Sequence, residues 1–399
     1  MLDQQEVNAR SIGDLAPVKS DSLLALIELA KADQRPEKID VGVGVYRDGE
    51  GRTPILDVVK EAEHRLWESQ ESKAYLGGRG DPRFALALRP ILLGEHEGDE
   101  AIQGLQTPGG CGALTLGFNL VRTANPGARV LIGTPTWPNH VPIISGSGLE
   151  IVEYCHYDRN ERKLCFGEML ETVKAARPGD VVLLHGCCHN PTGADLNADQ
   201  WAEVTGLIAE RGLLPLIDIA YQGLGEGLEP DGAGLRSVLA ACDSVIIAQS
   251  CDKNFGVYRD RVGSLWIKTA NPSSTATAMG HVLKLAREMW SMPPDHAAAA
   301  IRIVLEDAKL NAGWRSELET MRERILGLRR RLAAADPLFD YIAEQKGMFS
   351  MLPLTPEQVL KLRGDHAIYM ADSGRFNICG MGDGDVDRFA SAVLEVIGG

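Results

Sequence analysis

The feature of the sequence that most limits its fold is a recurring alternation of short apolar runs and longer helical patterns. Two of the runs, Val181–Leu184 and Val245–Ala248, are apolar at every position. Such runs are typical of strands that are covered on both faces, as in a mostly parallel sheet. Helical patterns lie between the runs, so the sequence predicts an α/β fold. We expect helices at Pro54–Ser69, Ala198–Arg211 and Gly234–Ala241, and strands at Asp40–Val45, Arg129–Gly133, Ile151–Tyr154, Asp180–His185, Leu213–Asp218, Ser244–Gln249 and Val262–Lys268.

The pattern changes after about residue 275, where helical periodicity dominates. The charged stretch Glu317–Leu332 is the clearest example, and a closing helix is expected at Val386–Ile397. Short β-like segments lie between them, at Gly347–Leu352 and Arg375–Cys379. This change predicts a second, smaller α/β domain at the C-terminal end, against which the N-terminal segment packs. We expect a large domain over residues 53–315, and a small domain made of residues 1–52 together with 316–399.

The charge of the chain limits the partners that it can have. A net charge of −14 and a pI of about 5.2 argue against nucleic acid and against anionic membrane surfaces, which both require basic protein surface. No apolar stretch approaches the roughly 18 residues that cross a bilayer. The polar start does not resemble a secretory leader, and the eight cysteines are spread along the chain. We therefore expect a cytoplasmic protein with reduced thiols.

Several polar residues follow predicted strands, and ligands of such sheets lie at the carboxyl ends of the strands. Lys253 follows the run Val245–Ala248. Burial there would lower its pKa, and only a neutral amine forms an imine with an aldehyde. Ser250 and Arg261 flank the lysine, and a hydroxyl and a guanidinium both suit a phosphate. The alternative is an ordinary lysine in a surface loop.

Asp218 ends the predicted strand Leu213–Asp218, in a run with no other charge. A buried carboxylate needs a cationic partner or several donors. A protonated pyridine nitrogen would be such a partner, and the pairing would keep the ring electron-deficient. Tyr221, three residues later, could donate to a ring oxygen. The alternative for Asp218 is a helix cap.

Two further segments contain turn signals. In the segment His185–Gly193, the cluster Cys187-Cys188-His189 has no second pair of ligands at the spacing of a structural zinc site, so we expect no metal. Asn190 begins a turn there and could also donate to a ring oxygen. The glycines of Thr107–Leu114 open a helical pattern, whose free N–H groups suit a phosphate. This segment follows no clear strand and lacks the dinucleotide-binding spacing.

Three bulky side chains complete the set of candidates. Trp137 lies between two prolines and could stack on a flat heteroaromatic ring, although packing in a loop is the alternative. Arg287 and Arg375 could each bind a carboxylate through two parallel hydrogen bonds, with surface ion pairs as the alternative.

Taken together, these segments resemble the class I pyridoxal-phosphate (PLP) aminotransferases, the aspartate and aromatic amino acid group. The resemblance extends from about Ile39 to Ile397, with the motifs in family order and spacing. The motifs are HGCCHNPTG at 185–193, DIAYQG at 218–223, KNFGVYRDRVG at 253–263, PTWPNH at 135–140 and SGR at 373–375.

The resemblance implies a PLP-dependent transferase fold of type I and a homodimer with shared active sites. It also implies the roles of individual residues. Lys253, Asp218, Tyr221 and Trp137 are catalytic. The cofactor-binding residues are Gly110, Cys111, Trp137, Asn190, Asp218, Tyr221, Ser250, Lys253, Arg261 and Tyr75 of the partner subunit, and His140 supports Asp218 from behind. The substrate-binding residues are Gly44, Trp137, Asn190, Arg375 and Arg287 of the partner subunit.

The implied reaction moves the amino group of aspartate or of aromatic amino acids to 2-oxoglutarate in two half-reactions. An aromatic preference, or a different PLP reaction such as that of a β-lyase, is the alternative. Two residues depart from the family pattern. Cys111 replaces a hydroxyl residue, and Asp252 replaces a serine beside the catalytic lysine. A carboxylate would repel the phosphate, so we expect Asp252 to turn to a nearby cation, or the cofactor to be held less tightly.

Overall fold

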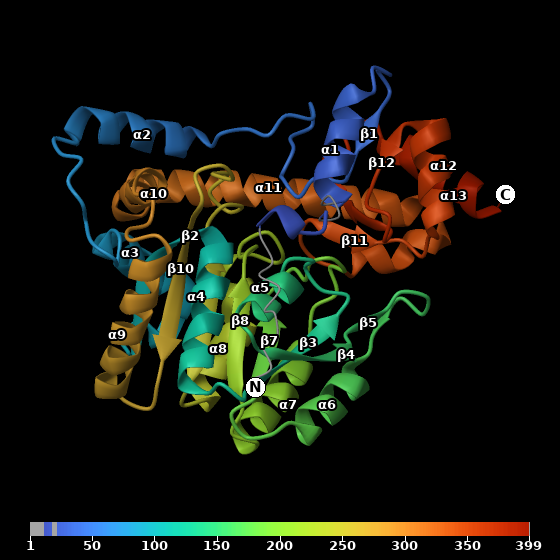
Figure 1. Ribbon diagram of the computed structural model, residues 1–399. Helices are drawn as coiled ribbons and strands as arrows, with labels where there is room; N and C mark the ends of the chain where they lie inside the picture. The colour runs from blue at the N-terminus through green and yellow to red at the C-terminus, as the bar shows by residue number, and fades with distance from the viewer. Residues whose placement is uncertain (1–11, 18–21, 399) are drawn as a thin grey trace, which may run out of the picture.

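The computed structural model describes residues 12–17 and 22–398, and a seven-stranded sheet lies at its centre (Figure 1). The strand order is β2-β10-β9-β8-β7-β3-β4. β10 runs antiparallel to both of its neighbours, and every other pair in the sheet is parallel. The bounds are β2 (Ile102–Pro108), β3 (Arg129–Thr134), β4 (Glu150–Cys155), β7 (Val181–His185), β8 (Leu214–Ile219), β9 (Val245–Ser250) and β10 (Val262–Lys268).

Helices cover both faces of this sheet, as the apolar runs predict. Val181 and Leu183 belong to one hydrophobic cluster, whereas Val182 and Leu184 belong to another on the opposite face. Burial of each such side chain contributes about 1.5–3 kcal/mol to folding. The first cluster includes α4 (Gly109–Ala124), α5 (His140–Gly146) and α9 (Pro272–Met289). The second includes α6 (Phe166–Ala175), α7 (Ala198–Glu210) and α8 (Leu228–Ala241).

The remaining elements are short strands and the helices that surround the central sheet. Their bounds are α1 (Ser22–Ala32), β1 (Ile39–Asp40), α2 (Asp57–Ser69), α3 (Pro82–Leu93), β5 (Tyr157–Asp158), β6 (Lys163–Leu164), α10 (His296–Glu306), α11 (Ala308–Ala335), β11 (Phe349–Met351), α12 (Pro356–His366), β12 (Ile368–Tyr369), β13 (Arg375–Asn377) and α13 (Val386–Gly398), with 3-10 turns at Ile12–Asp14, Gly94–His96, Pro337–Ala343 and Ile378–Gly380.

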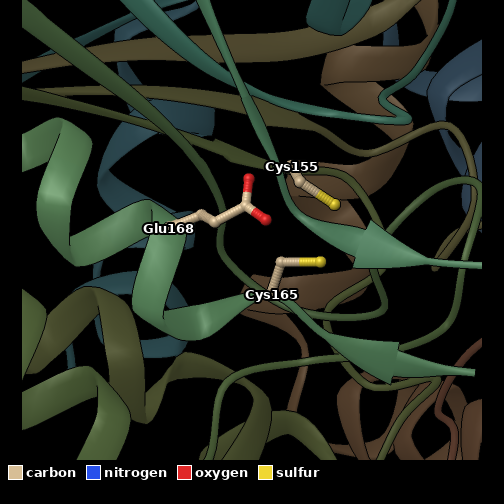
Figure 2. Close-up of side chains that lie close together, drawn as sticks. All are labelled: Cys155, Cys165 and Glu168. Carbon is tan, nitrogen blue, oxygen red and sulfur yellow. The ribbon is translucent and has the colours of Figure 1, made fainter. Parts of the chain in front are cut away.

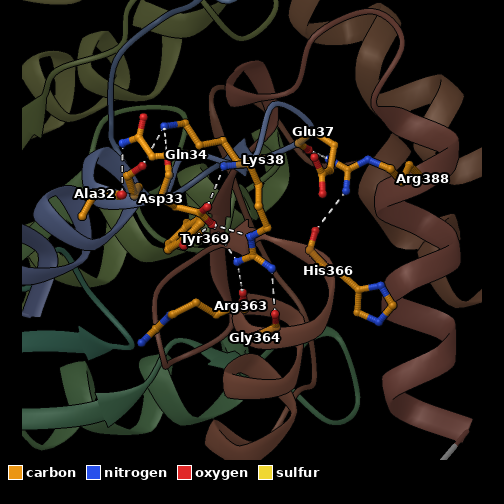
Figure 3. Close-up of polar contacts among 12 residues, drawn as sticks. Ala32, Asp33, Gln34, Glu37, Lys38, Arg363, Gly364, His366, Tyr369 and Arg388 are labelled. Atoms are coloured by element: carbon orange, nitrogen blue, oxygen red, sulfur yellow. Dashed lines mark hydrogen bonds and ion pairs between the residues drawn. The ribbon is translucent and has the colours of Figure 1, made fainter.

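The N-terminal segment lies against the C-terminal elements (Figures 1 and 3). β1 pairs with β12. Tyr369 donates to Asp33 at 2.6 Å, and Arg35 donates to the carbonyl oxygens of Arg363 and Gly364. These contacts agree with a small domain built from both ends of the chain, although the division at residues 315 and 316 stays a prediction. α11 runs without a break across that position.

A buried arginine in the C-terminal part of α11 holds β11 and the turn before it in place. Arg329 is fully buried, and its guanidinium donates to the carbonyl oxygens of Ile342, Gly347 and Phe349. Burial lowers the pKa of Arg329 to about 10. Because the carbonyl of Phe349 is held in this way, the Phe349 ring is placed beside the site described below.

The structure corrects two expectations. A strand over Asp40–Val45 is wrong, because β1 ends at Asp40 and its partner β12 offers only two residues for pairing. Beyond it, the side-chain amide of Asn377 donates to the carbonyl oxygens of Val43 and Val45, both at 2.7 Å, in place of a strand ladder.

The second correction is that the glycine-rich segment does follow a strand, β2, and α4 begins directly after it. Because β2 contains polar residues, it does not appear in the sequence as an apolar run. Gln106 is fully buried, where it accepts from the Asp81 N–H and donates to the Pro294 carbonyl. Gly104 has no side chain, and the ring of Trp266 packs against it. A Cβ added to Gly104 would lie only 2.5 Å from that ring.

None of the helices within the described residues combines the length and the apolar character that crossing a membrane requires.

Candidate active site

A pocket lies at the carboxyl ends of β7, β8 and β9. Strand register brings these ends together, because His185 pairs with Asp218 and Asp218 pairs with Ala248. The pocket encloses about 730 Å³ of empty space, including its open mouth, which suits a cofactor together with a small substrate. Its lining residues are Gly44, Gly110, Cys111, Leu114, Trp137, His185, Cys187, Asn190, Asp218, Ala220, Tyr221, Ser250, Asp252, Lys253, Tyr258 and Arg261.

One end of the pocket is formed by the start of α4. Gly109 adopts a left-handed φ of 66°, and this conformation turns the chain from β2 into the helix. A Cβ on Gly110 would approach the Cβ of Ser250 at 3.1 Å, so the helix start and the end of β9 lie side by side. Unpaired N–H groups of the first helical turn and the Ser250 hydroxyl therefore face one space. Such an end suits a phosphate.

Lys253, Tyr221 and Asn190 lie together beyond the strand ends. The Lys253 Nζ lies 5.4 Å from the centroid of the Tyr221 ring. Asn190 Nδ2 donates to the Tyr221 hydroxyl at 3.3 Å, which leaves the hydroxyl proton of Tyr221 available to a ligand. Burial raises the pKa of Tyr221 well above its usual range, so the residue remains a neutral donor.

Asp218 is held from behind by His140. His140 is fully buried, and its Nε2 lies 2.9 Å from the Asp218 carboxylate. Thr136 Oγ1 lies between two imidazoles, 2.8 Å from His140 Nδ1 and 3.2 Å from His185 Nε2. This chain of contacts fixes the orientation of the carboxylate and confirms the expected place of His140 behind Asp218. No pattern in the sequence indicated the contribution of Thr136.

Stacked imidazoles extend this chain away from the pocket. The ring centroids of His185 and His189 are 4.0 Å apart, and those of His189 and His156 are 3.8 Å apart. Burial holds the pKa values of His185 and His189 well below the usual range and lowers that of His156 to about 4. These three imidazoles are therefore neutral at pH 7. They therefore contribute no positive charge that could balance the Asp218 carboxylate.

Arg375 lies near the pocket, although it is not among the lining residues. Its Nη2 donates to the Gly42 carbonyl at 2.8 Å, and its guanidinium packs 4.9 Å from the Phe349 ring centroid. The same Phe349 ring lies 6.0 Å from that of Tyr221, and a Cβ on Gly44 would meet it at 3.0 Å. Arg375, Gly44 and Tyr221 therefore surround one aromatic ring at this end of the site.

Asp252 pairs with the arginine that was expected to hold a phosphate. Its carboxylate is buried, forms a short ion pair with Arg261 Nη1 and accepts the Val262 N–H at 3.1 Å. The same Nη1 donates to the Tyr258 carbonyl. Asp252 therefore turns to a nearby cation, as expected, and that cation is Arg261. A phosphate bound at this end would share the guanidinium with a carboxylate.

Tyr75 and Arg287 lie outside this pocket. Tyr75 is 89% exposed. Arg287 is exposed on the last turn of α9, and its Nη1 donates to Ser291 Oγ. The two segments that carry them meet, because the Leu76 N–H contacts Met292 Sδ at 3.1 Å.

The pocket also contains residues that the sequence did not single out. Tyr258 is an example: its hydroxyl accepts the Tyr46 N–H at 2.9 Å, and burial raises its pKa. In the sequence, only its place in the motif that begins at Lys253 indicates that Tyr258 belongs to the pocket.

The residues of the pocket fit PLP. The start of α4, Ser250 and Arg261 suit its phosphate, and Asp218 lies where a protonated pyridine nitrogen would balance its charge. Among the residues that the structure describes, the buried Asn190 Oδ1 has no hydrogen-bond partner, so it can still accept a hydrogen bond from a ligand. Trp137 lines the same space and offers a flat face. Lys253 supplies the amine that an aldehyde requires.

Comparisons with known proteins agree with this fit. Residues 36–393 match the family described as aminotransferase class I and II. The chain is 47% identical to a tyrosine aminotransferase of Rhizobium meliloti (92% of this chain, 95% of the relative). It is 44% identical to an aromatic-amino-acid aminotransferase of Paracoccus denitrificans and 38% identical to an aspartate aminotransferase of Escherichia coli (each 96% of this chain, 99% of the relative).

Two solved structures show the same fold. An aromatic amino acid aminotransferase with 3-indolebutyric acid superimposes with a TM-score of 0.94 at 44% identity, covering 97% of this chain and 100% of that one. An aromatic-amino-acid aminotransferase of Burkholderia pseudomallei, covalently bound to pyridoxal phosphate, gives 0.92 at 38% identity, covering 97% and 98%. The chain belongs to the class I and II aminotransferases, and its cofactor is pyridoxal phosphate.

Proposed function

We propose that this aminotransferase moves the amino group of aspartate and of aromatic amino acids to 2-oxoglutarate. The observation that carries the proposal is the convergence of Lys253, Asp218 and Tyr221 in one pocket, with Arg375 close to one end. Relatives named for tyrosine, aromatic amino acids and aspartate support both substrate classes. When bound, PLP supplies an aldehyde that reacts with the amino acid and a ring that accepts its electrons.

In this proposal, Lys253 is the catalytic base. Its amine would hold the bound cofactor in the resting enzyme, and once free it would remove the α-proton of the substrate and carry that proton. Asp218 favours the protonated pyridine nitrogen, and His140 orients Asp218. Tyr221 and Asn190 bind the ring oxygen, and Trp137 stacks on the ring. Gly110, Cys111, Ser250 and Arg261 bind the phosphate, where Cys111 contributes its backbone N–H.

Arg375 is the proposed site for the α-carboxylate of the substrate, with Gly44 close to it. The contacts with the Gly42 carbonyl and the Phe349 ring support this role, because they fix the guanidinium before a substrate arrives. A rigid arginine can form two parallel hydrogen bonds with a carboxylate.

We further propose a homodimer in which Tyr75 and Arg287 each serve the neighbouring subunit's pocket. Both residues are exposed and absent from the pocket of their own chain, and their segments meet where Leu76 contacts Met292. Each has an exposed apolar side chain close to it in sequence: Leu76 is 48% exposed and Met289 is 41% exposed. Burial of this surface against a second copy would place both residues at an interface.

Replacing Arg287 with leucine should separate the two substrate classes. We expect kcat/KM for aspartate to fall about 10- to 100-fold, because a charge-assisted hydrogen-bond pair with the distal carboxylate is worth about 1.5–3 kcal/mol. Phenylalanine, which lacks that carboxylate, should change little. Steady-state kinetics with both amino acids measure the effect, and Arg331→Leu, an exposed arginine on α11, is the matched control. Equal losses for the two substrates would contradict the role of Arg287.

The absorption of the bound cofactor tests the whole reaction. Aspartate or phenylalanine added alone to the PLP-loaded enzyme should bleach the band of the resting enzyme, and 2-oxoglutarate should restore it. An unrelated amine should give no such cycle. The relative rates for aspartate and phenylalanine decide whether the enzyme prefers aromatic substrates. A β-lyase on the same scaffold would instead release ammonia and need no 2-oxo acid acceptor.

Asp252→Ser should tighten cofactor binding. Removal of the carboxylate frees Arg261 for the phosphate and removes a like charge, so we expect the Kd for PLP to fall at least about tenfold, or about 1.4 kcal/mol. The buried carboxylate should also raise the second pKa of the phosphate, normally about 6, by repelling its dianion. The phosphorus NMR titration of the bound cofactor should therefore shift to lower pH in the variant.

Two further variants separate charge from shape. Asp252→Asn keeps the size of the side chain and should reproduce most of the gain. Asp260→Asn removes a carboxylate next to Arg261 in sequence that forms no ion pair with it, and should change neither value. A variant Asp252→Ser with unchanged affinity and an unchanged phosphate titration would show that Asp252 does not weaken the phosphate site.

We place the enzyme in the cytoplasm. All eight cysteines are free thiols in the structure, which supports a reducing compartment.

A further inference from the structure

Three side chains with metal-binding atoms meet where β4 ends and α6 begins (Figure 2). Cys155 is the last residue of β4, Cys165 directly precedes α6, and Glu168 lies in the first turn of that helix. The two sulfur atoms and a carboxylate oxygen of Glu168 all lie within 4.8 Å of one another. The cysteines are partly exposed and Glu168 is exposed, so an ion from solvent can reach all three.

These three side chains retain capacity to bind a ligand. Within the described residues, the Glu168 carboxylate takes part in no hydrogen bond or ion pair, and the Cys165 side chain does not cap α6. The Cys165 thiol forms a hydrogen bond with the Cys155 thiol. Each of these groups would be stabilised in its anionic form by a cation placed between them.

We propose that Cys155, Cys165 and Glu168 bind one thiophilic divalent cation, with Zn²⁺ as the best match. Zinc takes four ligands in a tetrahedron, with Zn–S of about 2.3 Å and Zn–O of about 2.0–2.2 Å, so its ligand atoms lie about 3.5–4 Å apart. The observed group, with its atoms within 4.8 Å of one another, is compatible with this spacing. A water molecule fills the fourth position. Two thiolates exclude Mg²⁺ and Ca²⁺, which prefer oxygen ligands.

The position of the site suggests what the cation does. Cys155 and Cys165 bracket the hairpin β5–β6, whose arginines reach toward the C-terminal part of the chain. Arg159 donates to the Ser373 carbonyl, and Arg162 donates to the Leu338 carbonyl, each at 2.9 Å. Ser373 lies two residues before Arg375. A cation at the base of the hairpin would join its two ends and stiffen this bridge, whether or not the proposed substrate assignment is correct.

A second group of potential ligands in the structure lacks this capacity. Cys187, Cys188 and Asp231 are buried together. The Asp231 carboxylate already accepts the backbone N–H groups of Gly223, Gly225 and Glu226 at 2.8–2.9 Å. We therefore assign the cation to the Cys155 site.

The test is a titration of the full-length, PLP-loaded enzyme with Zn²⁺ in competition with a chromophoric chelator, under a phosphine reductant. We expect one tight Zn²⁺ per chain. Cys155→Ser and Cys165→Ser should each weaken it at least about 10- to 100-fold, the loss that even outer-shell changes cause. Glu168→Gln should weaken it less. Titration with Cd²⁺ should produce a thiolate-to-cadmium ultraviolet band that both cysteine variants lose.

The control is Cys242→Ser, which removes a free thiol outside the group and corrects for Zn²⁺ bound by the cofactor or by other thiols. Unchanged cofactor absorption in each variant shows that it has folded, and Zn²⁺ should raise the Tm of the parent and of Cys242→Ser only. The proposal is overturned if the parent binds no Zn²⁺ beyond what Cys165→Ser binds, or if the cadmium band persists in both cysteine variants.

Discussion

Replacing Lys253 with alanine is expected to abolish turnover and to leave the cofactor bound without a covalent link. The lysine is the amine that lines the pocket beside Tyr221, and in the proposed reaction it both holds the aldehyde and moves the α-proton. General acid–base catalysis alone is worth about 10²–10⁴-fold. Loss of the covalent function adds to this, so we expect a loss of at least about 10⁴-fold in the half-reaction with aspartate.

The measurement combines rate with the site of attachment. Single-turnover absorption changes give the rate of the half-reaction. Borohydride treatment followed by mass spectrometry should find the cofactor attached to the peptide that contains Lys253 in the parent, and to no peptide in the variant. Lys174→Ala, an exposed lysine on α6 that pairs with Glu171, is the matched control and should behave like the parent. A variant that kept more than a trace of activity would show that another group transfers the proton.

The sequence predicted the central sheet and most of the pocket because one physical rule connects them. Strands that are apolar at every position indicate a sheet covered on both faces, and polar residues at their carboxyl ends must then face a common space. Lys253, Asp218 and Asn190 were found in this way, and all three line the pocket. Their individual roles came from the family resemblance, because a single carboxylate or amide after a strand is equally compatible with a helix cap or a turn.

The features that the sequence did not show depend on contacts between distant segments. β2 contains a buried glutamine, Gln106, and a glycine, Gly104, that are explained only by the Pro294 carbonyl and the Trp266 ring. The stacking of His156 on His189 requires β4 and the loop after β7 to approach across the sheet. The pair Asp252–Arg261 could be anticipated only as a carboxylate in need of a cation. That the cation is Arg261, the arginine proposed to bind the phosphate, emerges from the geometry.

The second large effect is expected for Asp218→Asn. An amide cannot hold a proton on the pyridine nitrogen, because it carries no charge to stabilise the cation. Two unit charges about 4 Å apart interact by about 4 kcal/mol at an effective dielectric constant near 20. The ring accepts electrons in the transition state of α-proton removal. Loss of that stabilisation in the transition state lowers the rate of α-proton removal about a thousandfold. The half-reaction rate with aspartate, at saturating PLP, measures this loss.

A matched variant of His140 makes this prediction specific. Burial keeps His185 and His189 uncharged, so these two imidazoles carry no positive charge that could balance the carboxylate. His140→Ala leaves the carboxylate in place and removes one hydrogen bond to a charged group, worth about 1.5–3 kcal/mol, so it should cost about 10- to 100-fold. The charge of Asp218 then accounts for the difference between the two variants. If Asp218→Asn lost no more activity than His140→Ala, orientation rather than charge would be the contribution of Asp218.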